Sequence, residues 1–188
     1  MQALGEVLPK AQIYTELAVR FAYGTDASCY RYVPEVVVRA QNEKEVLNIM
    51  QLAAQYHLPI TFRASGTSLS GQTSSDSILV VLGDEFVDAK ILDKGDKIKL
   101  RPMVIGSNAN LILKPFGRKI GPDPATINTA RIGGIAANNS SGMCCGTKDN
   151  SYHTLDTMRV ILADGTILDT ADVKSIADFK VSHHQFLA

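Results

Sequence analysis

The chain has 188 residues, of which 45% are hydrophobic, and this is enough for one domain with a buried core. Lysine and arginine total 19, as do aspartate and glutamate, so the formal net charge is zero and lacks the basic excess of a nucleic-acid binder. No apolar run reaches the roughly 18 residues that a transmembrane segment needs. The N-terminus lacks a basic start and an apolar core, so we expect no secretory signal and a cytoplasmic location.

The first half of the sequence predicts alternating strands and helices. Three short apolar runs are typical of strands: 35–39, 60–63 and 77–82. Apolar residues spaced four apart predict a helix over 10–21. A second helix should follow Asn42, a good N-cap residue, and end before Pro59. This order indicates an α/β unit with parallel strands.

The second half predicts antiparallel pairing. Two strand pairs are expected: 86–92 with 97–105, and 158–163 with 166–169 around the turn Asp164-Gly165. Helices are expected over 107–116, between Ser107 as N-cap and Gly117 as stop, and over 172–179. The predicted fold class is α+β in a single domain over 1–188. It has a small α/β lobe at about 23–83, an antiparallel-sheet lobe at about 84–170, and a ligand between them.

The most informative stretch is the loop that follows the strand at 60–63. Residues 63–72 hold two Gly, three Ser and one Thr, with no acid. Glycine allows positive φ and close approach, so the backbone N–H groups of such a loop suit an anion, above all a diphosphate. The residues predicted to bind it are Ser65, Gly66, Thr67, Ser68, Leu69, Gly71 and Gln72. The alternative is a plain connection without a ligand, and Arg63 either neutralises phosphate or forms a structural ion pair.

A second segment, 121–142, is also rich in small residues and amides. A backbone with few large side chains can lie against a flat or extended ligand, and asparagine offers both donors and acceptors. Two such loops, far apart in sequence, could hold one long ligand between them.

The two motifs together, R-x-x-G-T-S-L-S-G-Q and G-P-D-P followed by I-G-G-x-x-x-N-N-x-S-G, resemble the vanillyl-alcohol oxidase superfamily of FAD-linked oxidases with a PCMH-type FAD domain. The resemblance covers about 23–170, and Tyr23 to Arg31 is similar to the branch of D-lactate and D-2-hydroxyglutarate dehydrogenase-like flavoproteins. It implies the FAD-binding portion of an oxidoreductase. The reaction implied is oxidation of a D-2-hydroxy acid to a 2-oxo acid by hydride transfer to flavin N5.

The resemblance also assigns the second loop to the cofactor. The matching residues are Pro122, Asp123, Thr126, Thr129, Gly133, Gly134, Asn138, Asn139, Ser140, Ser141 and Gly142. Asp123, held extended between two prolines, could instead only cap a turn. Thr67 stands where several members of the superfamily carry a flavin-linked His, so the FAD is expected to be non-covalent. Met103 stands where related sequences usually have Gly, and its side chain could crowd the cofactor.

The resemblance further implies a cap domain with the substrate-binding residues, so we expect this domain to be C-terminally incomplete and inactive alone. No catalytic residue can be named. The expected partners are a small 2-hydroxy acid and an electron acceptor, without nucleic acid. A homodimer is one assembly that these expectations allow, and some members are peripheral to the inner membrane. Two alternatives stay open: a fragment that folds without holding flavin, and another branch of the superfamily, such as an alditol oxidase.

Cysteine and histidine give weaker signals. Cys144-Cys145 lacks the spacing of a zinc or iron–sulfur site, so small residues beside a loop are the preferred interpretation and no metal is expected. The pair His183-His184 lies in a polar tail, where a solvated surface is expected.

Overall fold

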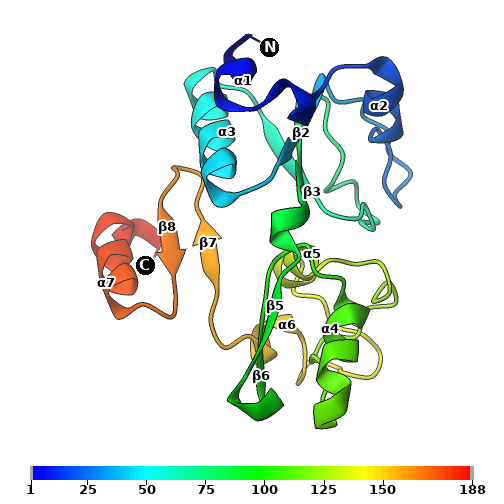
Figure 1. Ribbon diagram of the computed structural model, residues 1–188, viewed down its shortest axis with the longest axis vertical. Coiled ribbons are helices and arrows are strands. Elements are labelled where there is room, and N and C mark those ends of the chain that lie inside the picture. Colours follow the sequence, from blue (N-terminus) through cyan, green and yellow to red (C-terminus); the bar gives the residue numbers. More distant parts are fainter. Residues whose placement is uncertain (1, 187–188) are drawn as a thin grey trace. The chain divides into compact units, whose positions relative to one another are not determined.

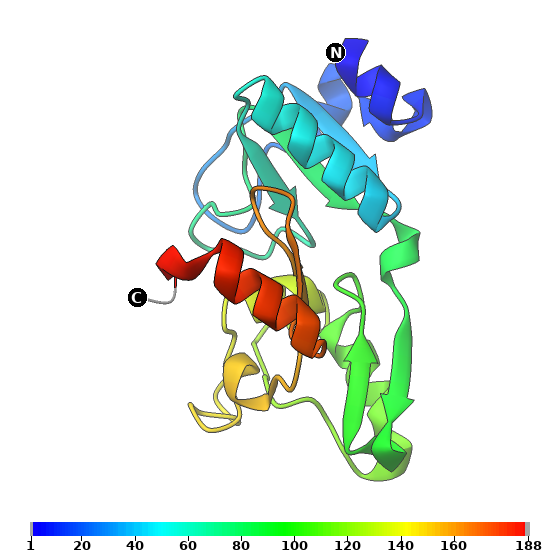
Figure 2. The same cartoon turned by 90° about the vertical axis from the view of Figure 1, so that its left-hand side faces the viewer.

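The computed structural model describes residues 2–186, drawn in two orientations in Figures 1 and 2. It divides into two compact units, one ending at Thr154 and the other beginning at Leu155. The boundary between two lobes near residue 83 stays a prediction.

A four-stranded sheet in the order β1-β2-β4-β3 organises the N-terminal part of the first unit. Strands β2 (Val36–Ala40) and β3 (Ile60–Arg63) both run parallel to the central β4 (Ile78–Leu82), which confirms the parallel pairing. Central strands covered on both faces are continuous apolar runs rather than alternating ones. The valines of β2 and the first three residues of β4 are accordingly buried.

Helix α3 (Glu43–Gln55) lies across one face of this sheet (Figure 2). Asn42 is its N-cap as predicted, because its side chain accepts a hydrogen bond from the Glu45 N–H at 3.0 Å. The Glu45 carboxylate in turn accepts from the Gln41 N–H at 2.7 Å. The helix buries Val46, Ile49, Met50 and Ala53. Helix α1 (Gln2–Val7), which the sequence did not predict, packs against it.

The helix predicted over 10–21 is wrong. The segment forms a 3-10 turn η1 (Lys10–Gln12), strand β1 (Ile13–Tyr14) and helix α2 (Leu17–Ala22). The apolar spacing did not mark a buried stripe, since Leu17 is 68% exposed. The free edge of β2 instead takes Ile13 and Tyr14 as an antiparallel strand.

The rest of the first unit begins with a 3-10 turn, η2 (Asp84–Phe86), and an antiparallel pair, β5 (Ala89–Leu92) with β6 (Lys97–Leu100), joined through η3 (Asp93–Gly95). The pairing is confirmed, although both strands are shorter than predicted. Helix α4 (Gly106–Leu113) begins before Ser107, so the predicted N-cap is wrong and Ile105 holds that position. The 3-10 turn η4 (Lys114–Phe116) then ends at Gly117, whose φ of 66° confirms the predicted stop.

Helix α5 (Ile132–Ala137) lies inside the segment 121–142 that was predicted as loop, and a further short helix, α6 (Ser151–Thr154), follows it. Both belong to the part of the first unit that follows α4.

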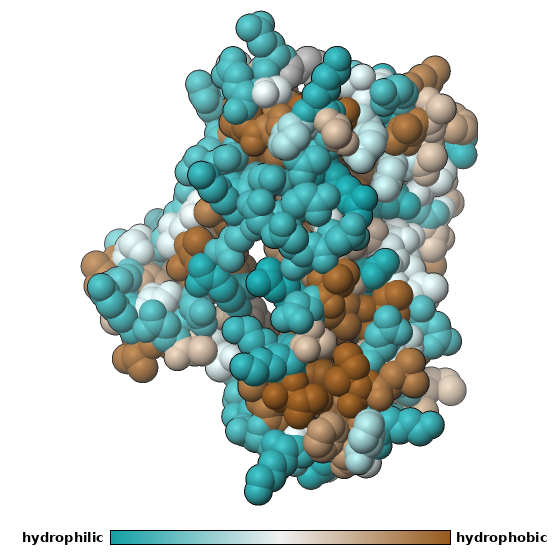
Figure 3. Space-filling view, viewed as in Figure 1, coloured by the Kyte–Doolittle hydropathy of each residue, from teal (hydrophilic) through white to brown (hydrophobic). Residues whose placement is uncertain are grey.

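The space-filling view shows a band of apolar surface in the region of β5 and α4 (Figure 3). Exposed apolar side chains of α4 and η4 are Leu111, Ile112 and Phe116.

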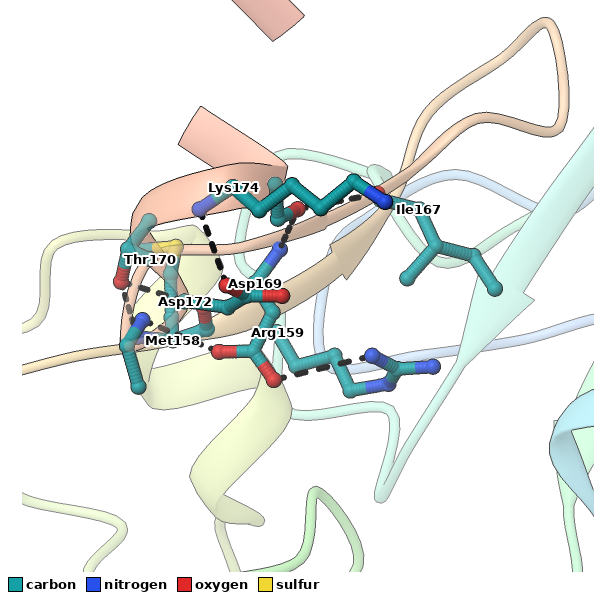
Figure 4. A network of polar contacts seen from close by, with 9 residues as sticks. Met158, Arg159, Ile167, Asp169, Thr170, Asp172 and Lys174 are labelled. Atoms are coloured by element: carbon teal, nitrogen blue, oxygen red, sulfur yellow. Dashed lines mark hydrogen bonds and ion pairs between the residues drawn. The ribbon is translucent and has the colours of Figure 1, made fainter. Parts of the chain in front are cut away.

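The second unit is the predicted hairpin followed by a helix. Strands β7 (Arg159–Ile161) and β8 (Ile167–Asp169) pair antiparallel, and α7 (Val173–Ser182) follows. Polar contacts close the base of the hairpin (Figure 4): the Met158 N–H donates to Thr170 Oγ1 at 2.7 Å, and Arg159 lies 3.6 Å from the Asp169 carboxylate. Asp172 is the N-cap of α7, since its side chain accepts from the Lys174 N–H at 2.9 Å.

His183 is buried, so the expectation of a solvated histidine pair is wrong at this position. It lies between α7 and the 3-10 turn η5 (His184–Phe186), and its ring stacks on Phe179 with a centroid distance of 4.8 Å. Its Nε2 lies 2.8 Å from the Asp164 carboxylate at the hairpin turn. Hydrogen bonds from the Thr166 N–H and from His183 hold the pKa of Asp164 below its usual value. These contacts secure helix to hairpin within the unit.

Candidate functional site

The first glycine loop presents a row of backbone donors. Among residues 2–186, none of the five successive N–H groups from Ser65 to Leu69 has an acceptor. The loop begins where β3 ends and is only partly buried. Backbone N–H groups left unpaired in a run are the donors that an anion uses. This is the arrangement that the diphosphate prediction requires.

Hydrogen bonds within the loop fix its second half. Ser68 Oγ donates to Gln72 Oε1 at 2.7 Å and accepts from the N–H groups of Ser70 and Gln72, each at 3.2 Å. Gly66 and Gly71 have φ of 69° and 74°, a region that favours glycine. A Cβ on Gly71 would lie 2.9 Å from the Tyr30 ring, so the segment around Tyr30 packs closely on the end of the loop. Ser68 and Gln72 thus shape the loop with their side chains.

Arg63 is structural. Its Nη1 donates to the carbonyl oxygens of Tyr23 and Thr25, at 3.0 and 2.7 Å. Burial lowers the pKa of Arg63, and attraction to Asp26 opposes that shift. Arg63 therefore secures the segment from Tyr23 onward through Nη1, while its Nη2 lies beside Gly66, 2.3 Å from where a Cβ would stand.

Asp26 joins the same segment to the far side of the loop. Its carboxylate accepts from the Ser28 N–H at 2.8 Å, from Ser28 Oγ at 2.5 Å and from Thr73 Oγ1 at 2.9 Å. Burial alone would raise the pKa of Asp26, but these hydrogen bonds outweigh burial and hold the pKa below its ordinary value of 3.8. The Ala27 N–H donates to the Gly66 carbonyl oxygen at 3.0 Å, so the loop is held from both sides.

Ser65 connects the first loop to the second. Its hydroxyl donates to the Thr129 carbonyl oxygen at 2.6 Å and accepts from Arg131 Nε at 3.2 Å. Arg131 Nη1 also donates to the Met103 carbonyl oxygen at 2.7 Å. Thr129 belongs to a turn closed on the Thr126 carbonyl oxygen by its own N–H at 2.8 Å, and both threonines are exposed. Three segments that are distant in sequence therefore meet at Ser65 and Arg131.

The second loop closes on itself at Asp123. The Asp123 N–H donates to the Ser141 carbonyl oxygen at 2.9 Å. A Cβ on Gly142 would lie 1.8 Å from the Asp123 carbonyl oxygen, so only glycine permits this approach. The Asp123 carboxylate lies 4.0 Å from Lys119 Nζ and caps no turn among residues 2–186. Pro122 beside it is buried. Asp123 and Gly142 thus define the frame of the loop through their backbones.

The small residues around α5 divide between structural contact and open surface. A Cβ on Gly133 would lie 2.8 Å from Pro102 Cβ, so this glycine serves packing, whereas a Cβ on Gly134 would meet nothing within 4 Å. The Asn139 Oδ1 accepts from the Tyr152 N–H at 3.0 Å. Asn138 is exposed, and its side chain has no partner within 2–186. Gly134 and Asn138 are the positions here that stay open to a ligand.

Two serines follow α5 with similar divided roles. The Ser140 carbonyl oxygen accepts from the N–H and the hydroxyl of Ser151, at 3.0 and 2.9 Å. Neither Ser140 Oγ nor Ser141 Oγ is bonded within the described part of the chain. Their hydroxyls are therefore available to a ligand, while their carbonyl groups maintain the fold.

Met103 does not stand out into the loops. Its side chain is buried, its N–H donates to the Phe86 carbonyl oxygen at 2.8 Å, and its own carbonyl accepts from Arg131. The backbone here accommodates a side chain. Met103 therefore occupies a core position, and its side chain is not directed at the loops as a group that would crowd a cofactor.

The predicted residues are thus brought together in two groups. Ser65 meets Thr129, and Asp123 meets Ser141 and Gly142. No hydrogen bond within 2–186 joins residues 66–72 to Gly134 or Asn138. The sequence did not predict the contacts of Arg131 or the hydrogen bonds by which Asp26 joins two segments. Neither residue lies in a local pattern that indicates such contacts.

Two further features bear on ligands. Within residues 2–186, no helix combines the length and the apolar character that crossing a bilayer demands. Cys145 is buried, and its thiol lies 3.6 Å from the Gly142 carbonyl oxygen, whereas Cys29 and Cys144 are exposed. No cluster of three or more metal-ligating side chains occurs among the residues that the structure describes.

The donor row, the open glycine and the unbonded hydroxyls and amide fit FAD, whose diphosphate needs donors and whose flat ring needs a bare surface. A family profile described as an FAD binding domain matches residues 34–171. Solved structures give the fold. The chain superposes on alkyldihydroxyacetonephosphate synthase with a TM-score of 0.74 and 17% identity, over 94% of this chain and 35% of that one.

Curated relatives match most of this chain, but the match covers only a small part of each relative's own length. A D-2-hydroxyglutarate dehydrogenase from Haemophilus influenzae is 27% identical over 171 residues, which are 89% of this chain and 17% of the relative. A probable mitochondrial D-lactate dehydrogenase from Danio rerio is 30% identical over 159 residues, 82% of this chain and 31% of the relative. The chain therefore spans less than a third of the length of these relatives. It belongs to the FAD-binding domain family of FAD-linked oxidases, with the PCMH-type fold.

Proposed function

We propose that this domain holds FAD non-covalently for the oxidation of a D-2-hydroxy acid of the D-lactate type to the 2-oxo acid. The main observation behind this proposal is the row of five N–H groups from Ser65 to Leu69, which have no acceptor within 2–186. The Ser65 hydroxyl joins this row to the second loop at the Thr129 carbonyl oxygen. The relatives named D-2-hydroxyglutarate dehydrogenase and D-lactate dehydrogenase support the substrate class.

In this proposal each group of residues has a separate task. The N–H groups of 65–69 bind the diphosphate, and Ser65 fixes their position by its bond to the Thr129 carbonyl oxygen. The open side of Gly134 leaves room for the flavin, and Asn138 supplies amide hydrogen bonds to it. Thr67 leaves the attachment non-covalent, because its hydroxyl cannot form the bond that a histidine forms. Bound FAD supplies a hydride acceptor at flavin N5, and the protein supplies placement.

The chain alone is proposed to be inactive, and two of its histidines are already engaged by other groups. His153 Nδ1 contacts the Thr147 carbonyl oxygen at 2.5 Å, and His183 contacts Asp164 in the second unit. The electron acceptor and a homodimer stay predictions.

Two measurements test the proposal. FAD should bind more tightly than FMN by about 10-fold or more, because FMN lacks the diphosphate that the loop binds through several hydrogen bonds. Equal affinity for FAD and FMN would contradict the diphosphate assignment.

The FAD-loaded chain should keep its visible spectrum when D-lactate is added without oxygen. Bleaching by D-lactate but not L-lactate would show that these residues suffice for catalysis, and bleaching by an alditol would favour the alternative branch.

A further inference from the structure

We infer that Arg131 supplies the positive charge of the diphosphate site and positions Ser65 in the loop. The inference rests on the proposed function, since it concerns the same anion. Arg131 immediately precedes the I-G-G motif at 132–134. Its contacts, its charge and the role of its neighbour Arg63 each support the assignment.

Arg131 touches the first residue of the donor row. Its Nε donates to Ser65 Oγ at 3.2 Å, and its Nη1 is fixed by the Met103 carbonyl oxygen at 2.7 Å. The backbone is fixed as well, because Arg131 pairs with Ile105 in an isolated antiparallel bridge. The guanidinium is therefore held at the start of the loop by groups from two other segments.

The charge of Arg131 has no counterion in the described chain. Among residues 2–186, no carboxylate lies within ion-pair distance of Arg131 or of Arg63, whereas Arg20, Arg39, Arg118 and Arg159 each have one. Its two hydrogen-bond acceptors, a hydroxyl and a carbonyl, are uncharged. A partly buried cation with only neutral partners is stabilised when an anion binds beside it.

Arg63, the other arginine at the loop, already forms hydrogen bonds within the protein. Arg63 donates to two carbonyl oxygens and is attracted to the Asp26 carboxylate. Arg131 instead contacts the donor row itself through Ser65, so we assign the charge of the diphosphate site to Arg131. The Ser65 hydroxyl that accepts from Arg131 also donates to the Thr129 carbonyl oxygen. The position of the Arg131 charge and the geometry of the loop therefore both depend on the Ser65 side chain.

The test compares FAD affinity of the wild type with Arg131→Gln, Arg131→Lys and the control Arg118→Gln, at low and high salt. Arg118 forms an exposed surface pair with Asp96, so its loss should leave FAD affinity unchanged. Arg131→Gln should lower the affinity about 10- to 100-fold. Arg131→Lys should recover most of it, and the salt dependence of the wild type should flatten in the Gln variant alone.

A structural role would give a different pattern. If Arg131 only bridged segments, Lys and Gln would lower both the unfolding temperature and the FAD affinity equally, with the salt dependence unchanged. That pattern would overturn the inference, as would wild-type affinity in Arg131→Gln. A folded wild type that does not bind FAD would instead overturn the proposed function, and the inference with it.

Discussion

The hydroxyl of Ser65 donates a hydrogen bond to the Thr129 carbonyl oxygen at 2.6 Å, joining two residues 64 positions apart. Ser65 begins the row of unpaired N–H groups, and Thr129 ends the turn that leads into α5. One short side chain therefore sets the position of the first loop against the second. In the proposed cofactor site this bond matters as much as the adjacent Gly66.

Ser65→Ala should weaken FAD binding while leaving the fold intact. The variant loses the bond to Thr129 and the acceptor for Arg131 Nε, each worth roughly 1 kcal/mol, so we expect a 5- to 30-fold rise in Kd. Fluorescence titration measures the effect. Ser70→Ala is the matched control, because the exposed Ser70 hydroxyl makes no bond within 2–186. An equal loss in both variants would remove the special role of Ser65.

A carboxylate on the loop should abolish FAD binding by repulsion, and Thr67 is the position to place it. At Gly66 a Cβ would lie 2.3 Å from Arg63 Nη2 and φ is 69°, so Gly66→Asp would also disturb the fold. Thr67 has no side-chain hydrogen bond within 2–186. Thr67→Asp should lose FAD binding at an unchanged unfolding temperature, and the neutral Thr67→Asn should keep most of it. Tight binding by Thr67→Asp would refute the loop assignment.

Two glycines of the second loop should respond oppositely. Gly142→Ala places a Cβ 1.8 Å from the Asp123 carbonyl oxygen, so it should destabilise the protein by about 1–3 kcal/mol. Gly134→Ala lies within α5 with open space around its Cβ, so it should raise stability by up to about 1 kcal/mol. It should nevertheless weaken FAD binding, because the added methyl occupies the space proposed for the flavin. Chemical denaturation and FAD titration of both variants measure these effects; unaltered FAD affinity in Gly134→Ala would place the flavin elsewhere.

Asp26 should make stability fall at acid pH. Its pKa in the folded protein is below the ordinary 3.8, so the folded state favours the carboxylate. The stabilisation is therefore present above pH 3.8 and is lost as the pH falls through the folded pKa. Asp26→Asn should be less stable at pH 7 and should lose less stability between neutral and acid pH than the wild type. Asp76→Asn, at an exposed site without a hydrogen bond in 2–186, is the control. Parallel pH profiles for Asp26→Asn and the wild type would contradict this role.

The sequence predicted what depends on local chemistry. Asn42 followed by Glu45 marks the start of α3, and Asp164-Gly165 marks the hairpin between β7 and β8, because caps and tight turns need particular residues. The parallel strands were predictable because β4 is a continuous apolar run.

The misses depend on tertiary contacts. Ile13 and Tyr14 became a strand because β2 offered a free edge, which no periodicity reveals. His183 is buried because Asp164 and Phe179 lie beside it. The assignment of the loop residues to a cofactor stays a prediction, and their separate structural roles required coordinates. Gly133 packs on Pro102 while Gly134 stays open, and the Ser65 hydroxyl joins the first loop to the Thr129 carbonyl oxygen.

The most direct test of the account is a titration of the purified chain with FAD, followed by flavin fluorescence and visible absorption. The account predicts saturable binding of one FAD per chain, with a shifted flavin spectrum, because the donors of 65–69 and the second loop already lie together in this structure. A chain that is folded by circular dichroism but leaves the flavin signal unchanged at saturating FAD would contradict it.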